Sequence, residues 1–263
     1  MDSVNVIEEP VGNAIAASGA IWRAPELGGE QYEVVLDRFH KIFKPKSYLE
    51  IGVFQGGTLR LATCPSIAID PYFSITHPVV NNKQELHFYQ HTSDVFFDNF
   101  NPEHILGRKI DMAFLDGLHK YEYLLRDFYN TERFCRRNSI IFFHDCLPSD
   151  AFVGRRDRSD YRLQAHSEKP DWWAGDVWKT VAILKKSRPD LIVVVFDAPP
   201  TGLVAITNLD PSSMVLADQY FDLVREYRDK ELADVGDGYV KSLRIVSTRQ
   251  MANAESLEAE FWL

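Results

Sequence analysis

Residues 48–57 read Tyr48-Leu49-Glu50-Ile51-Gly52-Val53-Phe54-Gln55-Gly56-Gly57. The apolar residues up to Val53 predict a short buried strand. The glycines that follow allow a tight turn and a close approach of the backbone to a ligand. Their spacing is not the G-x-G-x-x-G of dinucleotide enzymes, and no Lys-Ser/Thr pair follows Gly57, which excludes a phosphate-binding P-loop. The stretch therefore predicts the first strand and turn of an α/β fold.

Strand and helix patterns alternate on both sides of this stretch. Helical spacing covers 30–43, 119–136 and 216–227, with shorter helices expected from residue 58, from an N-cap at Ser93, and from a cap at Asp176 to about 186. Buried strands are predicted at 48–53, 66–70, 86–89, 110–115, 140–143, 191–196 and 203–207. The last two strands are joined mainly by Pro199-Pro200-Thr201-Gly202, too short for a parallel crossover. We therefore expect five βα units closed by an antiparallel hairpin.

Composition excludes several classes of protein. The chain has 263 residues, a net charge of −9 and 45% apolar residues, which is ordinary for a globular protein. The acidic balance argues against a nucleic-acid backbone as partner, and no apolar run approaches the roughly 18 residues of a membrane span. The first ten residues are acidic and carry no basic residue, which predicts no signal or transit peptide. Three scattered cysteines predict no disulfide framework. A cytoplasmic protein is expected.

Ligands of an open parallel sheet bind beyond the carboxyl ends of the strands. Asp70 ends the second predicted strand, about twenty residues past the glycine turn, where a carboxylate can accept hydrogen bonds from both hydroxyls of a ribose. The plain alternative is an aspartate that ends the strand before Pro71. Turn and acid together favour a ligand that contains a nucleoside and need no phosphate.

Four titratable residues follow the next two strands. Asp116-Gly117-Leu118-His119 leaves one strand, and His144-Asp145 ends the other. Carboxylates brought together are costly unless a cation or proton bridges them, so Asp116, His144 and Asp145 are candidates to hold a divalent metal. We expect His119 to begin the following helix, where the helix dipole keeps the ring neutral and able to accept a proton. Alternatively, His119 only caps the helix and His144 is a buried, hydrogen-bonded residue.

These motifs resemble a known family. The run from Tyr48 to Leu59 is similar to the first motif of class I S-adenosylmethionine-dependent methyltransferases. The runs 114–122, 143–145 and 175–179 resemble methyltransferase family 24, which is related to metal-dependent O-methyltransferases of the catechol and macrolide sugar types. The resemblance covers roughly 46–209. It implies a Rossmann-like three-layer α/β sandwich with a seven-stranded, mostly parallel sheet whose last strand is antiparallel.

The resemblance also implies roles for single residues. Glu50, Gly52 and Gly56 would shape the pocket for S-adenosylmethionine, and Asp70 would hold its ribose. We expect the remaining cofactor contacts from Val53, Phe54, Thr58, Pro71, Ser93 and Asp116. Asp116, His144 and Asp145 would bind magnesium or another divalent cation, although His144 stands where relatives more often have an oxygen ligand. His119 would take the proton from the acceptor hydroxyl.

The expected domain organisation is an extension at 1–29, a methyltransferase domain at 30–210 and a helical extension at 211–263. The long irregular segment 146–175 would close over the acceptor. Within it, Trp172 and Trp173 could stack on a ring but more often such a pair anchors a loop. Arg155, Arg156, Arg158 and Arg162 could recognise an anion but are more often solvated surface. A homodimer formed through the tail is left open.

The function expected from these features is metal-assisted methyl transfer to a hydroxyl of a small molecule or sugar. One alternative is a metal-dependent hydrolase, which leaves Glu50 and Asp70 without a task. Another is a nucleoside-binding protein that transfers no methyl group. The methyltransferase hypothesis requires Asp116 and Asp145 to share one cavity beside the nucleoside that Glu50 and Asp70 would anchor.

Overall fold

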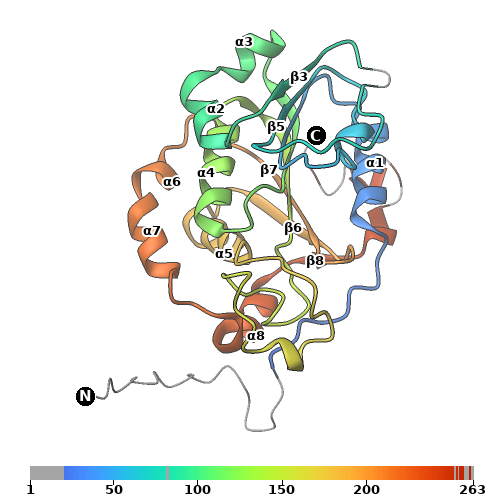
Figure 1. The fold of residues 1–263 in the computed structure, drawn as a ribbon. Helices are drawn as coiled ribbons and strands as arrows, with labels where there is room; N and C mark the ends of the chain where they lie inside the picture. Colours follow the sequence, from blue (N-terminus) through green and yellow to red (C-terminus); the bar gives the residue numbers. More distant parts are fainter. Residues whose placement is uncertain (1–20, 81–82, 252, 254, 258–260, 262–263) are drawn as a thin grey trace, which may run out of the picture.

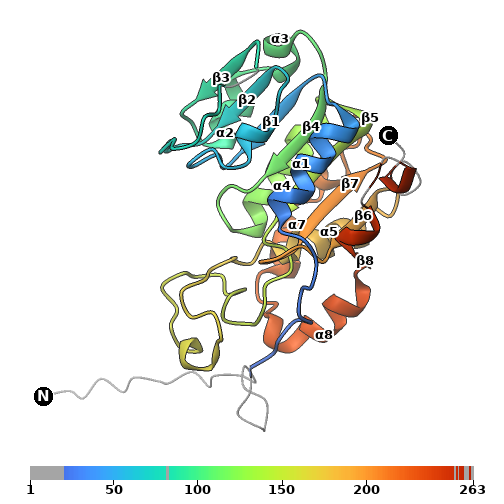
Figure 2. The ribbon, with the colours of Figure 1, turned by 90° about the vertical axis from the view of Figure 1, so that its right-hand side faces the viewer.

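An eight-stranded sheet forms the centre of the computed structural model, which describes residues 21–80, 83–251, 253, 255–257 and 261. The strands lie in the order β3-β2-β1-β4-β5-β7-β6-β8 (Figure 2). Their bounds are β1 Tyr48–Ile51, β2 Ser66–Ile69, β3 Leu86–Tyr89, β4 Ile110–Leu115, β5 Cys135–His144, β6 Ile192–Phe196, β7 Leu203–Thr207 and β8 Ile245–Val246. The first five strands are parallel, whereas β7 runs antiparallel to both β5 and β6.

The antiparallel hairpin predicted from the short β6–β7 connection is therefore confirmed. The predicted number of seven strands is one too few, because β8 pairs in parallel with β6 at the edge of the sheet. β8 has only two residues, too few to show an apolar alternation in the sequence.

Helices cover both faces of the sheet (Figure 1). α1 lies on one face, and α2, α4 and α5 lie on the other, with α7 outside them (Figures 1 and 2). The helices are α1 Tyr32–Phe43, α2 Ser93–Asn99, α3 Pro102–Leu106, α4 Tyr121–Glu132, α5 Trp178–Ser187, α6 Val215–Asp218, α7 Tyr220–Tyr227 and α8 Leu232–Ser242. Short 3₁₀ turns occur at η1 Leu59–Leu61, η2 Gln164–His166 and η3 Thr248–Met251.

The core is split by the sheet into two layers, because successive residues of a strand point to opposite faces. In β4, Met112 and Phe114 pack in the layer that contains Phe39 of α1. Ala113 and Leu115 pack in the other layer, which contains α4 and α5. This two-sided burial explains why the strands read as continuous apolar runs.

Several predicted helix starts are wrong. The helix expected from residue 58 is only the 3₁₀ turn η1. The cap of α2 is Thr92, whose hydroxyl accepts from the Val95 N–H, and Ser93 is the first helical residue. α4 begins at Tyr121 rather than at His119, and the Asp176 carboxylate accepts from the Tyr121 N–H instead of capping α5.

The two ends of the described chain pack on the sheet domain and on each other. Trp22 donates a 3.0 Å hydrogen bond to Asp237 of α8, and its ring lies against Gly236. Arg23 forms a β-bridge with Asp150, at the start of the long irregular segment. The rest of the expected N-terminal extension, residues 1–20, lies outside the described residues. Within the described chain, every helix is too short or too polar to cross a membrane.

Gly52 fixes how closely the ends of β1 and β4 approach. Its φ is +85°, and a Cβ at this position would lie 1.9 Å from the carbonyl oxygen of Asp116. A side chain here would meet both backbone strain and a steric clash.

We predict that Gly52→Ala lowers the free energy of unfolding in urea by about 2–5 kcal/mol. Gly57→Ala is the matched control in the same turn, because the nearest atom to its Cβ would be 3.5 Å away. Equal stabilities of the two variants would contradict this account of the turn.

Candidate active site

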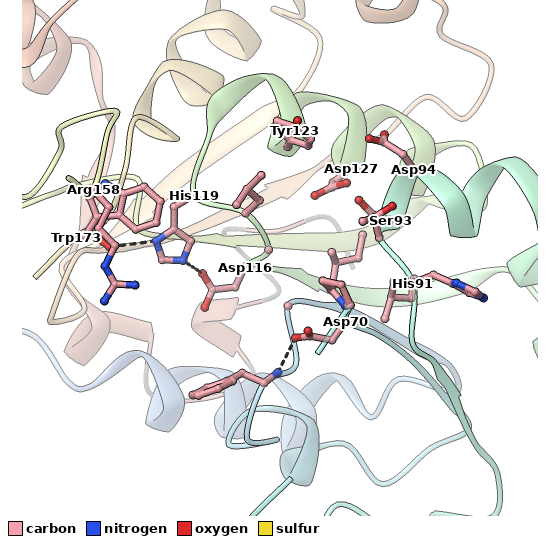
Figure 3. A pocket seen from close by; sticks show the side chains of 18 residues that line it. Asp70, His91, Ser93, Asp94, Asp116, His119, Tyr123, Asp127, Arg158 and Trp173 are labelled. Atoms are coloured by element: carbon pink, nitrogen blue, oxygen red, sulfur yellow. Dashed lines mark hydrogen bonds and ion pairs between the residues drawn. The ribbon is translucent and has the colours of Figure 1, made fainter. Parts of the chain in front are cut away.

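A cavity of about 640 Å³ opens at the carboxyl ends of β1, β2 and β4 (Figure 3). Its walls come from the turn after β1, the ends of β2 and β3, the start of α2, the loop before α4, and the segment 158–173. The lining residues are Ile51, Gly52, Phe54, Ile69, Asp70, Pro71, His91, Thr92, Ser93, Asp94, Asp116, Gly117, Leu118, His119, Tyr123, Asp127, Arg158 and Trp173. The cavity therefore lies where ligands of this kind of sheet bind.

Asp70 is held at one side of the cavity by backbone donors. Its Oδ2 accepts from the Phe54 N–H at 2.8 Å and its Oδ1 from the Tyr72 N–H at 2.7 Å. Phe54 has a φ of +43°, which turns this N–H toward the carboxylate. Each oxygen keeps a further lone pair for a ligand hydroxyl.

The other expected cofactor residues divide into two groups. Gly52, Phe54, Pro71, Ser93 and Asp116 line the cavity, as Asp70 does. The other four, Glu50, Val53, Gly56 and Thr58, are not among the described residues that line it, and they shape the turn behind the cavity.

Glu50 is fully buried inside the β1 turn. Its carboxylate accepts from the Tyr48 hydroxyl at 2.6 Å and from the Thr58 hydroxyl at 2.7 Å. Burial raises the pKa of Glu50 to about 7, although the two hydrogen bonds oppose this shift. Glu50 therefore ties the strand to the turn beneath the cavity.

The four titratable residues predicted at the strand ends do converge. Asp116 follows β4, His144 is the last residue of β5, and Asp145 follows it with a φ of +60°. Nδ1 of His144 lies 3.5 Å from a carboxylate oxygen of each aspartate. Nδ1 of His119 lies 3.2 Å from Asp145, and its Nε2 lies 3.5 Å from Asp116. The ligand atoms of Asp116, His144 and Asp145 all lie within 4.8 Å of one another.

The predicted neutral state of His119 is not what its surroundings favour. Burial lowers the pKa of His119, but the hydrogen bond with Asp116 and the charge of Asp145 outweigh it and raise the pKa to about 9. The helix dipole has less effect than expected because α4 begins two residues later. Burial raises the pKa of Asp116, but the charges and hydrogen bonds of His144 and His119 outweigh burial. The pKa of Asp116 is therefore lowered.

The hydrogen bonds of His119 show which of its ring nitrogens can exchange a proton. Nδ1 lies 3.1 Å from the carbonyl oxygen of Trp173, which can only accept, so Nδ1 carries a proton. Nε2 is then the atom that can gain or lose a proton beside Asp116. The indole of Trp173 stacks on the imidazole at 5.2 Å and 20°, so the second tryptophan of the long segment packs against the site itself.

Two further residues support the cluster and carry no signal in the sequence. Thr201, in the β6–β7 turn, donates to Asp145 at 2.5 Å. The ring of Tyr32 packs on His144 with centroids 4.1 Å apart. Both lie far from the cluster along the chain, and only the antiparallel pairing of β5 with β7 and the packing of α1 bring them there.

Two carboxylates and an imidazole at these distances form a suitable donor set for a hard divalent cation. Asp116 and His119 face the large cavity, while Asp145 and His144 line a small adjoining one together with them. A cation there would offset the repulsion between the aspartates and remain accessible from the cavity through Asp116.

Comparison with known proteins agrees with this geometry. Residues 49–146 match the family model described as a methyltransferase domain, family 24. The match covers less than half of the chain, but it includes Asp70 and all four clustered residues. Among curated proteins, none matches the chain in sequence.

Solved structures with a similar arrangement include three methyltransferases. An O-methyltransferase of Bacillus cereus in complex with S-adenosylhomocysteine is 10% identical, with 67% of this chain and 80% of that chain covered and a TM-score of 0.45. A methyltransferase of Podospora anserina bound to S-adenosylhomocysteine is 14% identical, with 68% and 78% covered and a TM-score of 0.44. The O-methyltransferase TomG of Streptomyces achromogenes, in complex with S-adenosylmethionine, is 15% identical, with 67% and 78% covered and a TM-score of 0.43.

The sheet and the cavity have the arrangement expected from the resemblance to class I, S-adenosylmethionine-dependent methyltransferases. The segment 49–146 matches the model of a methyltransferase domain, family 24. The resemblance read from the sequence motifs is thus confirmed.

The raised pKa of Glu50 predicts a pH-dependent stability. Between pH 4.5 and 7 the folded protein holds this proton more tightly than the unfolded chain, so stability falls as pH rises through that window. Glu50→Gln has no proton to lose. Its stability relative to the parent should therefore rise by on the order of 3 kcal/mol from pH 4.5 to 7, since one pKa unit corresponds to about 1.4 kcal/mol.

Urea unfolding at pH 5 and pH 8, without cofactor, measures this difference. Glu26→Gln, at an exposed position, serves as the control and should follow the parent at both values. If the parent and Glu50→Gln lose or gain stability in parallel, Glu50 does not titrate as described.

Proposed function

We propose that the protein transfers the methyl group of S-adenosylmethionine to a hydroxyl oxygen of a small molecule or sugar, with the help of a divalent cation. One observation supports this above all. A single cavity is lined by Asp70 at one side and by Asp116 and His119 at the other. A nucleoside held by Asp70 and an acceptor beside His119 would therefore meet inside one cavity.

The cofactor side of the proposal depends on the turn after β1. The Asp70 carboxylate, fixed by the N–H groups of Phe54 and Tyr72, would accept hydrogen bonds from the ribose hydroxyls. Gly52 keeps the backbone of the turn close to the end of β4, so that a cofactor bound at the turn would be aligned with an acceptor beside Asp116. Such alignment supplies a large part of the rate of a bimolecular transfer.

The acceptor side depends on the four clustered residues. Asp116, Asp145 and His144 would hold magnesium or another divalent cation, which when bound lowers the pKa of a nearby hydroxyl. Asp116 and Asp145 raise the pKa of His119, and a bound cation would offset their charges and so lower that pKa again. The Nε2 of the neutral His119 would then accept the proton of the acceptor hydroxyl, while its Nδ1–H stays bonded to the Trp173 carbonyl. Trp173 covers the imidazole and helps to exclude water from it.

Calorimetry tests the cofactor site. We predict that the parent protein binds S-adenosylmethionine and that Asp70→Asn weakens this binding by at least about tenfold, since hydrogen bonds to a charged group are lost. Asp98→Asn, at an exposed position of α2, should bind as the parent does. Heat from magnesium alone and none from S-adenosylmethionine would favour the hydrolase instead.

Methyl transfer to a panel of hydroxylated small molecules tests the reaction. His119→Ala should lower kcat by about 10²–10⁴ and leave the affinity for S-adenosylmethionine unchanged, because the lost group acts only on the acceptor proton. Asp145→Asn should abolish the dependence of the rate on added magnesium. Cofactor binding without transfer to any acceptor, unaltered by His119→Ala, would identify a nucleoside-binding protein.

A further inference from the structure

Arg158 lies on the wall of the cavity, on the side of Trp173 and His119 (Figure 3). Among the described residues that line the cavity, it is the only lysine or arginine. Its guanidinium carbon lies 5.9 Å from the centre of the Trp173 ring, which in turn stacks on His119. No acidic side chain of the described chain lies within ion-pair distance of it.

The neighbouring arginines of the segment 155–162 are engaged elsewhere. Arg155 is buried and donates to the backbone carbonyls of Phe152, Trp172 and Arg158, at 2.7, 3.0 and 3.0 Å. Trp173 in turn donates from its indole to the Arg155 carbonyl at 2.9 Å. Arg155 therefore holds Arg158 and Trp173 in place and is not itself open to a ligand.

Arg156 and Arg162 are bound to acids of the chain. Arg156 pairs with Glu122 of α4 and with Asp176, the latter at 2.9 Å. Arg162 pairs with Asp160, two residues away, on the exposed surface. Of the four arginines, Arg158 alone faces the cavity with its charge unpaired by an acid of the described chain.

Of the four aspartates that line the cavity, Asp127 is buried, which raises its pKa to about 7, and the other three already have partners. Asp94 accepts two hydrogen bonds of 2.7 Å from Arg126. Asp70 accepts two backbone N–H groups, and Asp116 lies against His119. An anion entering near Arg158 would thus find one uncompensated positive charge rather than a field of free carboxylates.

We propose that Arg158 and Trp173 form the acceptor subsite, and that the acceptor is a hydroxylated planar ring carrying a carboxylate or similar anion. This inference rests on the function proposed above. Because Trp173 touches both His119 and Arg158, the anionic group lies about one ring width from the hydroxyl that is methylated. The guanidinium then binds the anion with paired N–H donors, and the indole packs on the ring.

A matched pair of probes separates charge from shape. The probes are 3,4-dihydroxybenzoate and 3,4-dihydroxybenzamide, which share ring and hydroxyls and differ in charge. Their binding is measured by calorimetry in the presence of S-adenosylhomocysteine and magnesium, for the parent, Arg158→Gln and Arg162→Gln. Arg162→Gln is the control because it lies in the same segment but pairs with Asp160.

We expect the parent and Arg162→Gln to prefer the benzoate over the benzamide by about tenfold or more, and Arg158→Gln to lose that preference. Benzamide binding should be the same in all three proteins. Equal affinities for the two probes in the parent, or binding of neither, would overturn the proposal. So would a preference for benzoate that survives in Arg158→Gln.

A second arm separates the acceptor from the cofactor, whose methionine part also carries a carboxylate. Arg158→Gln should bind S-adenosylhomocysteine as tightly as the parent, and a comparable loss there would assign Arg158 to the cofactor and overturn the proposal. The outcome is independent of turnover. A charge preference that depends on Arg158 stands even if no methyl group is transferred, whereas failure of the proposed function is seen in the transfer assay alone.

Discussion

The parallel pairing of β1 with β4 positions the two sides of the cavity relative to each other. Ile51 is in register with Leu115, and the Asp116 N–H donates to the Ile51 carbonyl at 2.8 Å. Gly52 permits the backbone after β1 and the backbone after β4 to stay in contact beyond the last paired residues. The turn after β1 and the Asp116 carboxylate are consequently held side by side by the backbone itself.

Electrostatics then distinguish the two sides of the cavity. At one side, the Asp70 carboxylate accepts from two backbone N–H groups. At the other side, two aspartates and two histidines lie close together, and each changes the proton affinity of the others. Such a cluster favours a bound cation or proton, and its burial strengthens the electrostatic interactions among its members.

The sequence predicted those residues of the site that come directly after the carboxyl ends of the strands. Residues such as Asp116 and Asp145 could be found because buried strands are readable as apolar runs and because parallel strands end on one side. The charge of His119 could not be predicted, since it depends on a helix start displaced by two residues and on distances to carboxylates. Thr201 and Tyr32 could not be found either, because polar residues in a turn or on a helix look alike until the strands are paired.

Arg155 has a consequence for the segment that covers the site. Its guanidinium binds carbonyls from both limbs of the segment, and the indole of Trp173 returns a bond to its own carbonyl. These hydrogen bonds tie the two limbs of the segment 146–175 to each other within the fold. A different tip could therefore be grafted between residues 156 and 171 without removing the bonds that Arg155 makes with Phe152 and Trp172.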